Sequence, residues 1–131
     1  MQQKVLFKHC DPAGIVFFPR YFEMMNDCME IFFDKVLGAP FEELHKVNAV
    51  PTASISTRFT APSRHGDQLT LSLSIDHVGR SSARYTMKAH AEEELRFETE
   101  GTLVFVGHDG RPQSWPSELR MSLIKQKELA A

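Results

Sequence analysis

One aspartate, Asp11, stands immediately before the most apolar segment of this sequence. A carboxylate can attack a carbonyl carbon as a nucleophile or take a proton from water as a general base, and the residue types leave both roles open. Pro12 disfavours helical backbone at Asp11 and so restricts where the carboxylate points. Gly14 allows a positive φ or a close approach of the backbone to a ligand. Asp11 and Gly14 are therefore candidates for a catalytic loop.

The residues after this loop predict a long helix that begins beside the carboxylate. Pro19 suits a first helical turn, apolar residues recur at helical spacing over residues 20–37, and Gly38 and Pro40 are stop signals. The first N–H groups of a helix have no partner within it and carry partial positive charge. The backbone N–H of Phe18 is therefore a candidate oxyanion donor. The apolar side chains expected to fill the core or line a bound substrate are those of Phe17, Tyr21, Phe22 and Met25.

The apolar arc of this helix is wide, and the segments that follow Pro51 alternate between apolar and polar residues. Such an arc indicates a helix covered on most sides, and such alternation indicates strands with one buried face. The predicted elements are strands near 3–8, 54–59, 69–76, 83–90 and 95–106, the helix, and a short helix near 116–125. This order predicts one α+β domain over residues 1–131, in which a curved five-stranded antiparallel sheet wraps around the long helix.

Composition argues against several classes of protein. The chain has 131 residues, 42% hydrophobic and 24% charged, and a formal net charge of −2, so no nucleic-acid surface is indicated. Acidic residues interrupt the longest apolar run, which argues against a membrane partner, and the N-terminal MQQKVLFK lacks the features of a secretion signal. Cys10 and Cys28 lack paired spacing and are expected to be free thiols in the cytoplasm. The histidines show no metal-ligand spacing, so no metal or other cofactor is predicted.

The segment CDPAGIVFFPRYF, residues 10–22, resembles the signature of the 4-hydroxybenzoyl-CoA thioesterase family in its single-aspartate branch. Gly66–Asp67 and the turn Gly79–Ser82 also occur where that family has them. The predicted order of elements resembles the family's hotdog fold, in which a sheet wraps a central helix, and the similarity extends over residues 3–107. It implies hydrolysis of an acyl thioester, usually an acyl-CoA, by a homodimer or homotetramer with sites at subunit interfaces. Strand faces rich in Ser and Thr also favour pairing of sheet edges.

The resemblance also implies roles for individual residues. It places the catalytic carboxylate at Asp11 and the carbonyl-polarising N–H at Phe18. Contacts with the CoA phosphates fall on Arg80, Ser81 and Ser82, and an arginine suits that task because it can form charge-assisted, bidentate hydrogen bonds. A thiol has a pKa of about 8.5, far below that of water, so a thiolate leaves readily without a strong general acid. One carboxylate and one donor then suffice.

Several alternatives stay open. Phe17 and Phe18 stand where the related branch acting on short acyl groups often has Tyr-His, so the acyl group is not fixed. A non-catalytic module that binds acyl-CoA or acyl-carrier protein would keep the same pocket. A hotdog dehydratase is disfavoured, because the paired Asp and His expected for hydration of a double bond are not evident. Glu23 and Glu30 are secondary candidates, because another hotdog branch uses an acid on the helix.

Overall fold

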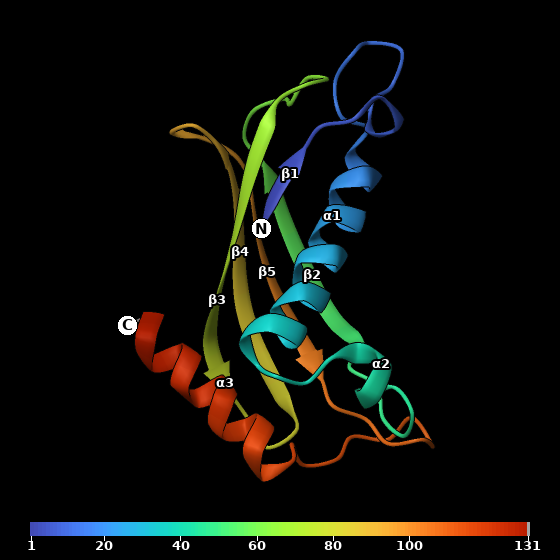
Figure 1. The fold of residues 1–131 in the computed structure, drawn as a ribbon, viewed down its shortest axis with the longest axis vertical. Helices are drawn as coiled ribbons and strands as arrows, with labels where there is room; N and C mark the ends of the chain where they lie inside the picture. Colours follow the sequence, from blue (N-terminus) through green and yellow to red (C-terminus); the bar gives the residue numbers. More distant parts are fainter. Residues whose placement is uncertain (131) are drawn as a thin grey trace.

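Five antiparallel strands form one curved sheet in the computed structural model, which describes residues 1–130 (Figure 1). The spatial order is β1-β3-β4-β5-β2, so β1 and β2 lie at the two edges. The strands are β1 (Gln2–Lys4), β2 (Thr52–Phe59), β3 (Gln68–Val78), β4 (Ser82–Ala91) and β5 (Glu94–Val104). The predicted five-stranded antiparallel sheet is confirmed.

Helix α1 (Phe18–Ile31) runs along the sheet and carries the long apolar segment (Figure 1). Its N-cap is Phe17, and Pro19 lies in its first turn. The chain continues as a π-helical turn over Phe32–Val36, before Gly38 adopts a φ of +68°. The predicted helix over 20–37 is therefore α1 plus this turn. Gly38 ends it because glycine adopts a positive φ at little cost.

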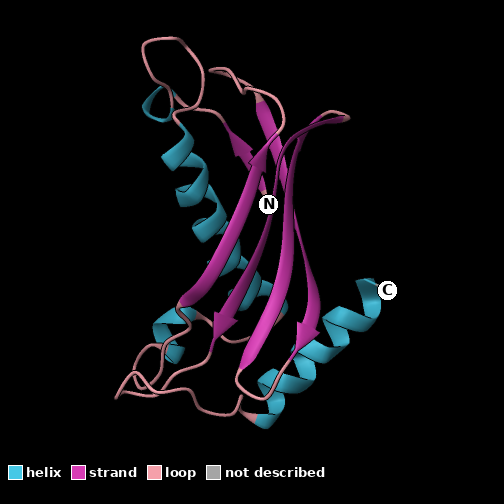
Figure 2. Cartoon of the chain, turned by 180° about the vertical axis from the view of Figure 1, so that it is seen from behind, coloured by secondary structure: helices cyan, strands magenta, loops and turns pink. Residues whose placement is uncertain are grey.

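The outer face of α1 corrects the expectation of a helix covered on most sides. Glu23, Asn26, Asp27 and Glu30 are exposed, and the side chain of Ile31 is 45% exposed. The sheet lies against one side of the helix only, as the view from behind also shows (Figure 2). Within one chain α1 is thus an amphipathic helix with one buried stripe.

The core lies between α1 and the sheet. The alternation predicted for β3 and β4 appears directly in the burial of every second residue along much of both strands. Each Leu, Met or Phe side chain buried in this way contributes about 1.5–3 kcal/mol. This packing fixes α1, and with it Phe18, against the sheet. The largest fully buried side chains include Phe33, Phe97, Met24, Leu69, Leu71, Ile75, Met87 and Leu123.

Helix α3 (Ser117–Ala130) closes the fold against β3. It buries Leu119 and Leu123, and the indole N–H of Trp115 donates to the carbonyl of Ser82 over 3.0 Å. The predicted C-terminal helix is confirmed, and it extends beyond the expected end. These contacts tie α3 to the turn between β3 and β4.

Two short helices were not predicted. A 3-10 helix over Phe7–His9 follows β1, which ends at Lys4 instead of continuing to residue 8. Helix α2 (Phe41–Leu44) follows Pro40. Helices of three or four residues are too short to show a hydrophobic period, so the sequence pattern cannot reveal them.

Both cysteines are free thiols, as predicted, and Cys28 is buried. Burial raises the pKa of the Cys28 thiol, which makes it a poor nucleophile. In the described part of the chain, residues 1–130, no helix combines the length and the apolar character that crossing a membrane requires.

Candidate active site

A short antiparallel ladder holds the Asp11 loop against the start of α1. Backbone hydrogen bonds of 2.9 and 3.0 Å close its two ends, from the N–H of Phe17 to the carbonyl of His9 and from the N–H of Asp11 to the carbonyl of Ile15. Because of this register, Asp11 is the last residue at one end of this small unit and Phe18 directly follows its other end, although six residues separate them. The pairs of the ladder are His9–Phe17, Cys10–Val16 and Asp11–Ile15.

The turn that closes the ladder orients the Asp11 carboxylate. The N–H of Ala13 donates to Asp11 Oδ1 over 2.9 Å, and the N–H of Gly14 donates to the Asp11 carbonyl over 2.9 Å. Gly14 has a φ of +81°, so this turn uses the positive φ that the sequence suggested. Asp11 is half-buried, and its Oδ2 has no hydrogen-bond partner among residues 1–130. That oxygen is available for chemistry.

The start of α1 presents one free backbone donor. Pro19 has no N–H, and the N–H of Arg20 donates to the carbonyl of Phe17 over 2.8 Å. The N–H of Phe18 pairs with no acceptor in the part of the chain that the structure describes. It lies at the positive end of the helix dipole, where a developing oxyanion would be stabilised.

An aromatic patch surrounds this donor, formed by Phe17, Phe18, Phe22 and Phe59. Phe17, Phe18 and Phe59 are 47%, 56% and 43% exposed, which is high for phenylalanine. Phe59 comes from β2 and meets Phe18 and Phe22 edge to face, with ring centroids 6.1 and 6.2 Å apart. Phe17 and Phe18 pack against each other in the same way at 5.7 Å. The patch is an apolar surface that can receive another apolar group.

Two of the predicted substrate-lining residues, Tyr21 and Met25, are buried instead. Each is 4% exposed. The Tyr21 ring stacks on Phe59 at 5.6 Å, and its hydroxyl donates to Ser63 Oγ over 2.8 Å. Burial raises the pKa of Tyr21, although the bond to Ser63 opposes this. Tyr21 thus supports the aromatic patch from beneath, and Met25 belongs to the core.

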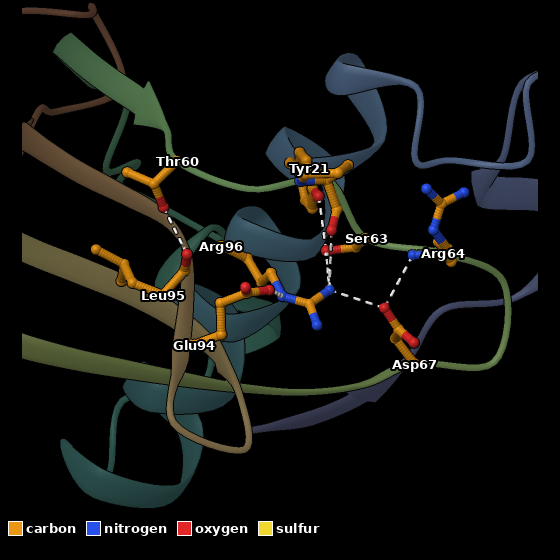
Figure 3. A network of polar contacts seen from close by, with 9 residues as sticks. Tyr21, Thr60, Ser63, Arg64, Asp67, Glu94, Leu95 and Arg96 are labelled. Carbon is orange, nitrogen blue, oxygen red and sulfur yellow. Dashed lines mark hydrogen bonds and ion pairs between the residues drawn. The ribbon is translucent and has the colours of Figure 1, made fainter.

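A polar network that sequence reasoning missed lies beside the ladder (Figure 3). At its centre is Arg96 of β5, whose side chain is only 12% exposed. Its Nη1 donates to the Pro62 carbonyl over 3.0 Å, to Ser63 Oγ over 3.2 Å and to Asp67 Oδ2 over 2.7 Å. Its Nε lies 2.8 Å from Glu94 Oε1, an ion pair without the alignment of a hydrogen bond. The Gly-Asp pair at Asp67 was the only sequence signal for this network.

The network shifts the pKa of both charged partners. The N–H of Arg64 and the guanidinium of Arg96 both bond the Asp67 carboxylate and lower its pKa. Burial lowers the pKa of Arg96, but the hydrogen bond and charge of Asp67 outweigh it and raise the pKa overall. Both groups therefore stay ionised at neutral pH.

His9 is a buried histidine at the other side of the ladder. It is 6% exposed, and its Nδ1 accepts the N–H of Leu6 over 2.9 Å. Burial lowers the pKa of His9, and the nearby charge of Lys8 lowers it further. The ring is therefore neutral at pH 7, as an acceptor at Nδ1 requires.

The predicted CoA-binding residues lie far from Asp11 in the same chain. Arg80, Ser81 and Ser82 form the turn between β3 and β4, at the bottom of Figure 1, whereas the Asp11 loop lies at the top. Arg80 is exposed and both serines are half-buried. The Ser81 carbonyl accepts the N–H of Phe105 over 2.7 Å, which anchors the turn to the end of β5. One chain therefore does not bring these three residues together with Asp11.

The surface around Phe18 is open in one chain, because Phe17 and Phe18 are 47% and 56% exposed. Neither Asp11 nor Phe18 lines the five cavities of 350 to 600 Å³ described on residues 1–130. The apolar slot expected from the sequence is instead an open surface, the aromatic patch. Another surface must cover it before water is excluded from a bound substrate.

A model of the thioesterase superfamily matches residues 13–98. The match begins just after Asp11, so it includes Phe18 and the polar network but not the carboxylate itself. The chain is also 31% identical over 85 residues to a 4-hydroxybenzoyl-CoA thioesterase from Pseudomonas sp. strain CBS-3. That alignment covers 63% of this chain and 60% of the Pseudomonas protein.

Solved structures share the fold over nearly the whole chain. A gentisyl-coenzyme A thioesterase is 24% identical, with a TM-score of 0.86 over 94% of this chain and 98% of that one. A 1,4-dihydroxy-2-naphthoyl-CoA thioesterase from Synechocystis is 18% identical, with a TM-score of 0.86 over 95% and 93% of the two chains. These likenesses confirm the predicted hotdog fold.

Proposed function

Because the chain belongs to the thioesterase superfamily, we propose that it hydrolyses an acyl-CoA thioester to a free acid and CoA. The observation that carries the proposal is the ladder, which places a carboxylate with a free oxygen and a helix start with a free N–H in one small unit. The thioester carbonyl oxygen would accept the N–H of Phe18, and Asp11 Oδ2 would face the carbonyl carbon or a water beside it.

Two routes balance with these groups. As a general base, Asp11 takes a proton from water while the oxygen of that water bonds to the carbonyl carbon, and the intermediate then expels CoA thiolate. As a nucleophile, Asp11 bonds to the carbonyl carbon itself, thiolate leaves, and water cleaves the mixed anhydride. In both routes the negative charge on the carbonyl oxygen develops beside the N–H of Phe18. Single-turnover hydrolysis in oxygen-18 water that labels the enzyme would identify the anhydride route.

An aromatic acyl group is the substrate class that the aromatic patch favours. Edge-to-face and stacked contacts between rings add about 0.5–1.5 kcal/mol beyond area burial, and three of the four patch residues are 43–56% exposed. The Pseudomonas relative acts on 4-hydroxybenzoyl-CoA, which carries such a ring. Benzoyl-type thioesters should therefore be better substrates than short aliphatic ones.

The working unit proposed is a homodimer paired through the free edge of β2, with a tetramer as a possible higher assembly. Seven of the eight residues of β2 are exposed, and the strand contains no Lys, Glu or Pro and only one charged residue, Arg58, to discourage pairing. Ile55 and Phe59 of this strand are 44% and 43% exposed. Pairing would cover both side chains, and the partner would then form one side of a pocket over the aromatic patch.

Such a pairing would also bring the predicted CoA-binding residues to the site. A two-fold axis beside the middle of β2 makes the β2 strands of the two copies antiparallel. The lower end of the sheet in one copy then lies beside the upper end of the sheet in its partner. The Arg80–Ser82 end of one copy would then lie toward the Asp11 end of its partner. We propose that the three residues contact CoA in that way, in trans. The two free thiols fit a reducing compartment such as the cytoplasm.

The test is release of free thiol from a panel of aromatic, short and long acyl-CoAs by the purified protein. Hydrolysis of at least one thioester, with turnover in the range of about 1–10³ s⁻¹ usual for enzymes, is expected. Calorimetry of CoA binding, run beside this assay, tests the alternative of a non-catalytic binding module. CoA binding without thiol release from any member of the panel would identify a non-catalytic binding module and reject the hydrolase.

A further inference from the structure

Ser63 is bonded to both halves of the candidate site. It is fully buried, with 0% exposure. Its carbonyl accepts the N–H of Val16 over 2.8 Å, and its Oγ accepts the hydroxyl of Tyr21 over 2.8 Å. Val16 belongs to the ladder that carries Asp11, and Tyr21 lies in the first turn of α1. Ser63 therefore joins the carboxylate loop to the helix start.

Arg96 in turn fixes Ser63 to the sheet (Figure 3). Its Nη1 donates to Ser63 Oγ and to the preceding carbonyl, and it also binds Asp67 Oδ2. Asp67 Oδ2 accepts the N–H of Arg64 over 2.9 Å, and Arg64 pairs with Ile15 of the ladder in an antiparallel bridge. The guanidinium thus holds both ends of the segment 63–67, on which the ladder rests.

We propose that Arg96 is a positioning residue of the hydrolytic site, because through Ser63 and Asp67 it sets the Asp11 carboxylate relative to the N–H of Phe18. This inference rests on the proposed function. A displacement of about 1 Å at a reacting centre can cost about 100-fold in rate. Arg96 can therefore control turnover without touching the substrate.

The position of Arg96 predicts how its loss divides between kcat and KM. The guanidinium faces the segment 63–67 and belongs neither to the aromatic patch nor to the turn at Arg80. Its removal should leave substrate affinity nearly intact and should misplace the two catalytic groups. A purely structural role would instead destabilise the whole fold, which lowers the amount of active protein and speeds the exchange of the β4 amides together with that of the Val16 N–H.

The experiment compares kcat and KM of the wild type with those of Arg96→Met, Arg96→Lys and Glu94→Gln. Arg96→Met should lower kcat about 10- to 100-fold, with KM changed less than about twofold. Arg96→Lys should recover part of this, because its ammonium group has three N–H donors, but the shorter side chain does not reach the position of Nη1 and lacks the Nε that contacts Glu94. Glu94 touches the same guanidinium with a side chain that is 61% exposed, so Glu94→Gln is the matched control and should keep wild-type values.

Ser63→Ala covers the case in which Arg96→Met does not fold. It removes only the hydroxyl that Arg96 and Tyr21 share, and it should show the same loss in kcat. Amide hydrogen exchange supplies a readout that does not depend on activity. The Val16 N–H should exchange at least about tenfold faster in Arg96→Met and Ser63→Ala, while amides of β4 keep their protection.

These readouts distinguish the two proposals. A wild type that hydrolyses nothing would remove the proposed function, and the exchange rates would still show whether Arg96 holds the loop. An active wild type whose folded Arg96→Met and Ser63→Ala variants keep kcat within twofold would overturn the positioning role. So would a loss of kcat with unchanged Val16 exchange.

Discussion

The N–H of Phe17 donates to the carbonyl oxygen of His9 over 2.9 Å, so the cap of helix α1 is bonded two residues before Asp11. The loop and the helix start therefore move together. The conformation of one short turn, at Asp11–Gly14, decides where the carboxylate stands relative to the free N–H of Phe18.

Gly14→Ala should impair hydrolysis beyond its effect on stability. Gly14 has a φ of +81° with no atom within 4 Å of an added Cβ, so the cost is backbone strain of about 1–2 kcal/mol. Gly110 provides the matched control, because its φ is +80° and it too has open space. Both variants should lose similar unfolding free energy in urea, but only Gly14→Ala should lose kcat. Equal activity of the two variants would show that the turn does not orient Asp11.

Ile55→Lys should dissociate the dimer. The 44% exposed Ile55 lies on the unpaired edge strand β2, where pairing would bury it and where two like charges would face each other across the axis. Light scattering should give a dimer or tetramer for the wild type at micromolar concentration and a monomer for the variant. Thiol release should fall with it, since the proposed site is completed by the partner's surface.

Met121→Lys is the control for this experiment. Met121 is 70% exposed on α3, away from the β2 edge, and its replacement should leave both assembly and activity unchanged. A wild-type monomer that still hydrolyses acyl-CoA would contradict the interfacial site.

Arg80→Gln should raise KM for acyl-CoA about tenfold without changing kcat, which corresponds to one charge-assisted hydrogen bond of about 1.4 kcal/mol. The same acyl group on pantetheine lacks the nucleotide phosphates, so its KM should not respond. Arg84→Gln makes the same charge change at another exposed position of β4 and should have little effect. Equal KM values for Arg80→Gln and the wild type on acyl-CoA would exclude the phosphate contact.

The stability of the fold should fall as His9 gains a proton. The pKa of His9 in the folded chain lies below the ordinary histidine value of 6.5, so below pH 6.5 the unfolded chain binds more protons than the folded one. The contribution of neutral His9 to the unfolding free energy should therefore be complete above pH 6.5. Below pH 6.5 it should decline by at most about 1.4 kcal/mol per pH unit for one proton.

His9→Asn checks this assignment. Asn Oδ1 can replace Nδ1 as acceptor for the Leu6 N–H but does not titrate. The unfolding free energy of His9→Asn, measured by urea denaturation at a series of pH values, should therefore no longer decline below pH 6.5 through this residue. Asp67 affects stability in a separate pH range, because its lowered pKa matters only below the ordinary aspartate value of 3.8. A slope that persists in His9→Asn would assign the effect to another group.

The sequence predicted those parts of the fold that repeat along the chain. The alternation from Leu69 to Ile75 and the helical spacing after Pro19 correspond to β3 and α1. Asp11, Gly14 and Phe18 could be proposed as site residues from the sequence because their chemistry is local to one loop and one helix start. The open outer face of α1 was missed, because an apolar arc does not reveal whether the same chain or a partner covers it.

The network around Arg96 could not be predicted in the same way. Arg96 is 33 residues from Ser63 and 29 from Asp67, and only the folded sheet brings them together. An arginine in a strand is usually a solvent-facing residue, and nothing in its neighbours marks this one as buried. Tertiary contacts of this kind leave no period and no spacing in the sequence.

The decisive measurement is thiol release by Asp11→Asn beside Glu30→Gln on the best acyl-CoA. Asparagine keeps the bond from the Ala13 N–H to Oδ1 and removes only the charge, so the variant should fold like the wild type. We expect kcat to fall at least about 100-fold in Asp11→Asn, the scale of a lost general base, and to stay unchanged in Glu30→Gln, whose acid lies on the outer face of α1. A folded Asp11→Asn protein with kcat within twofold of the wild type would show that another group performs the hydrolysis.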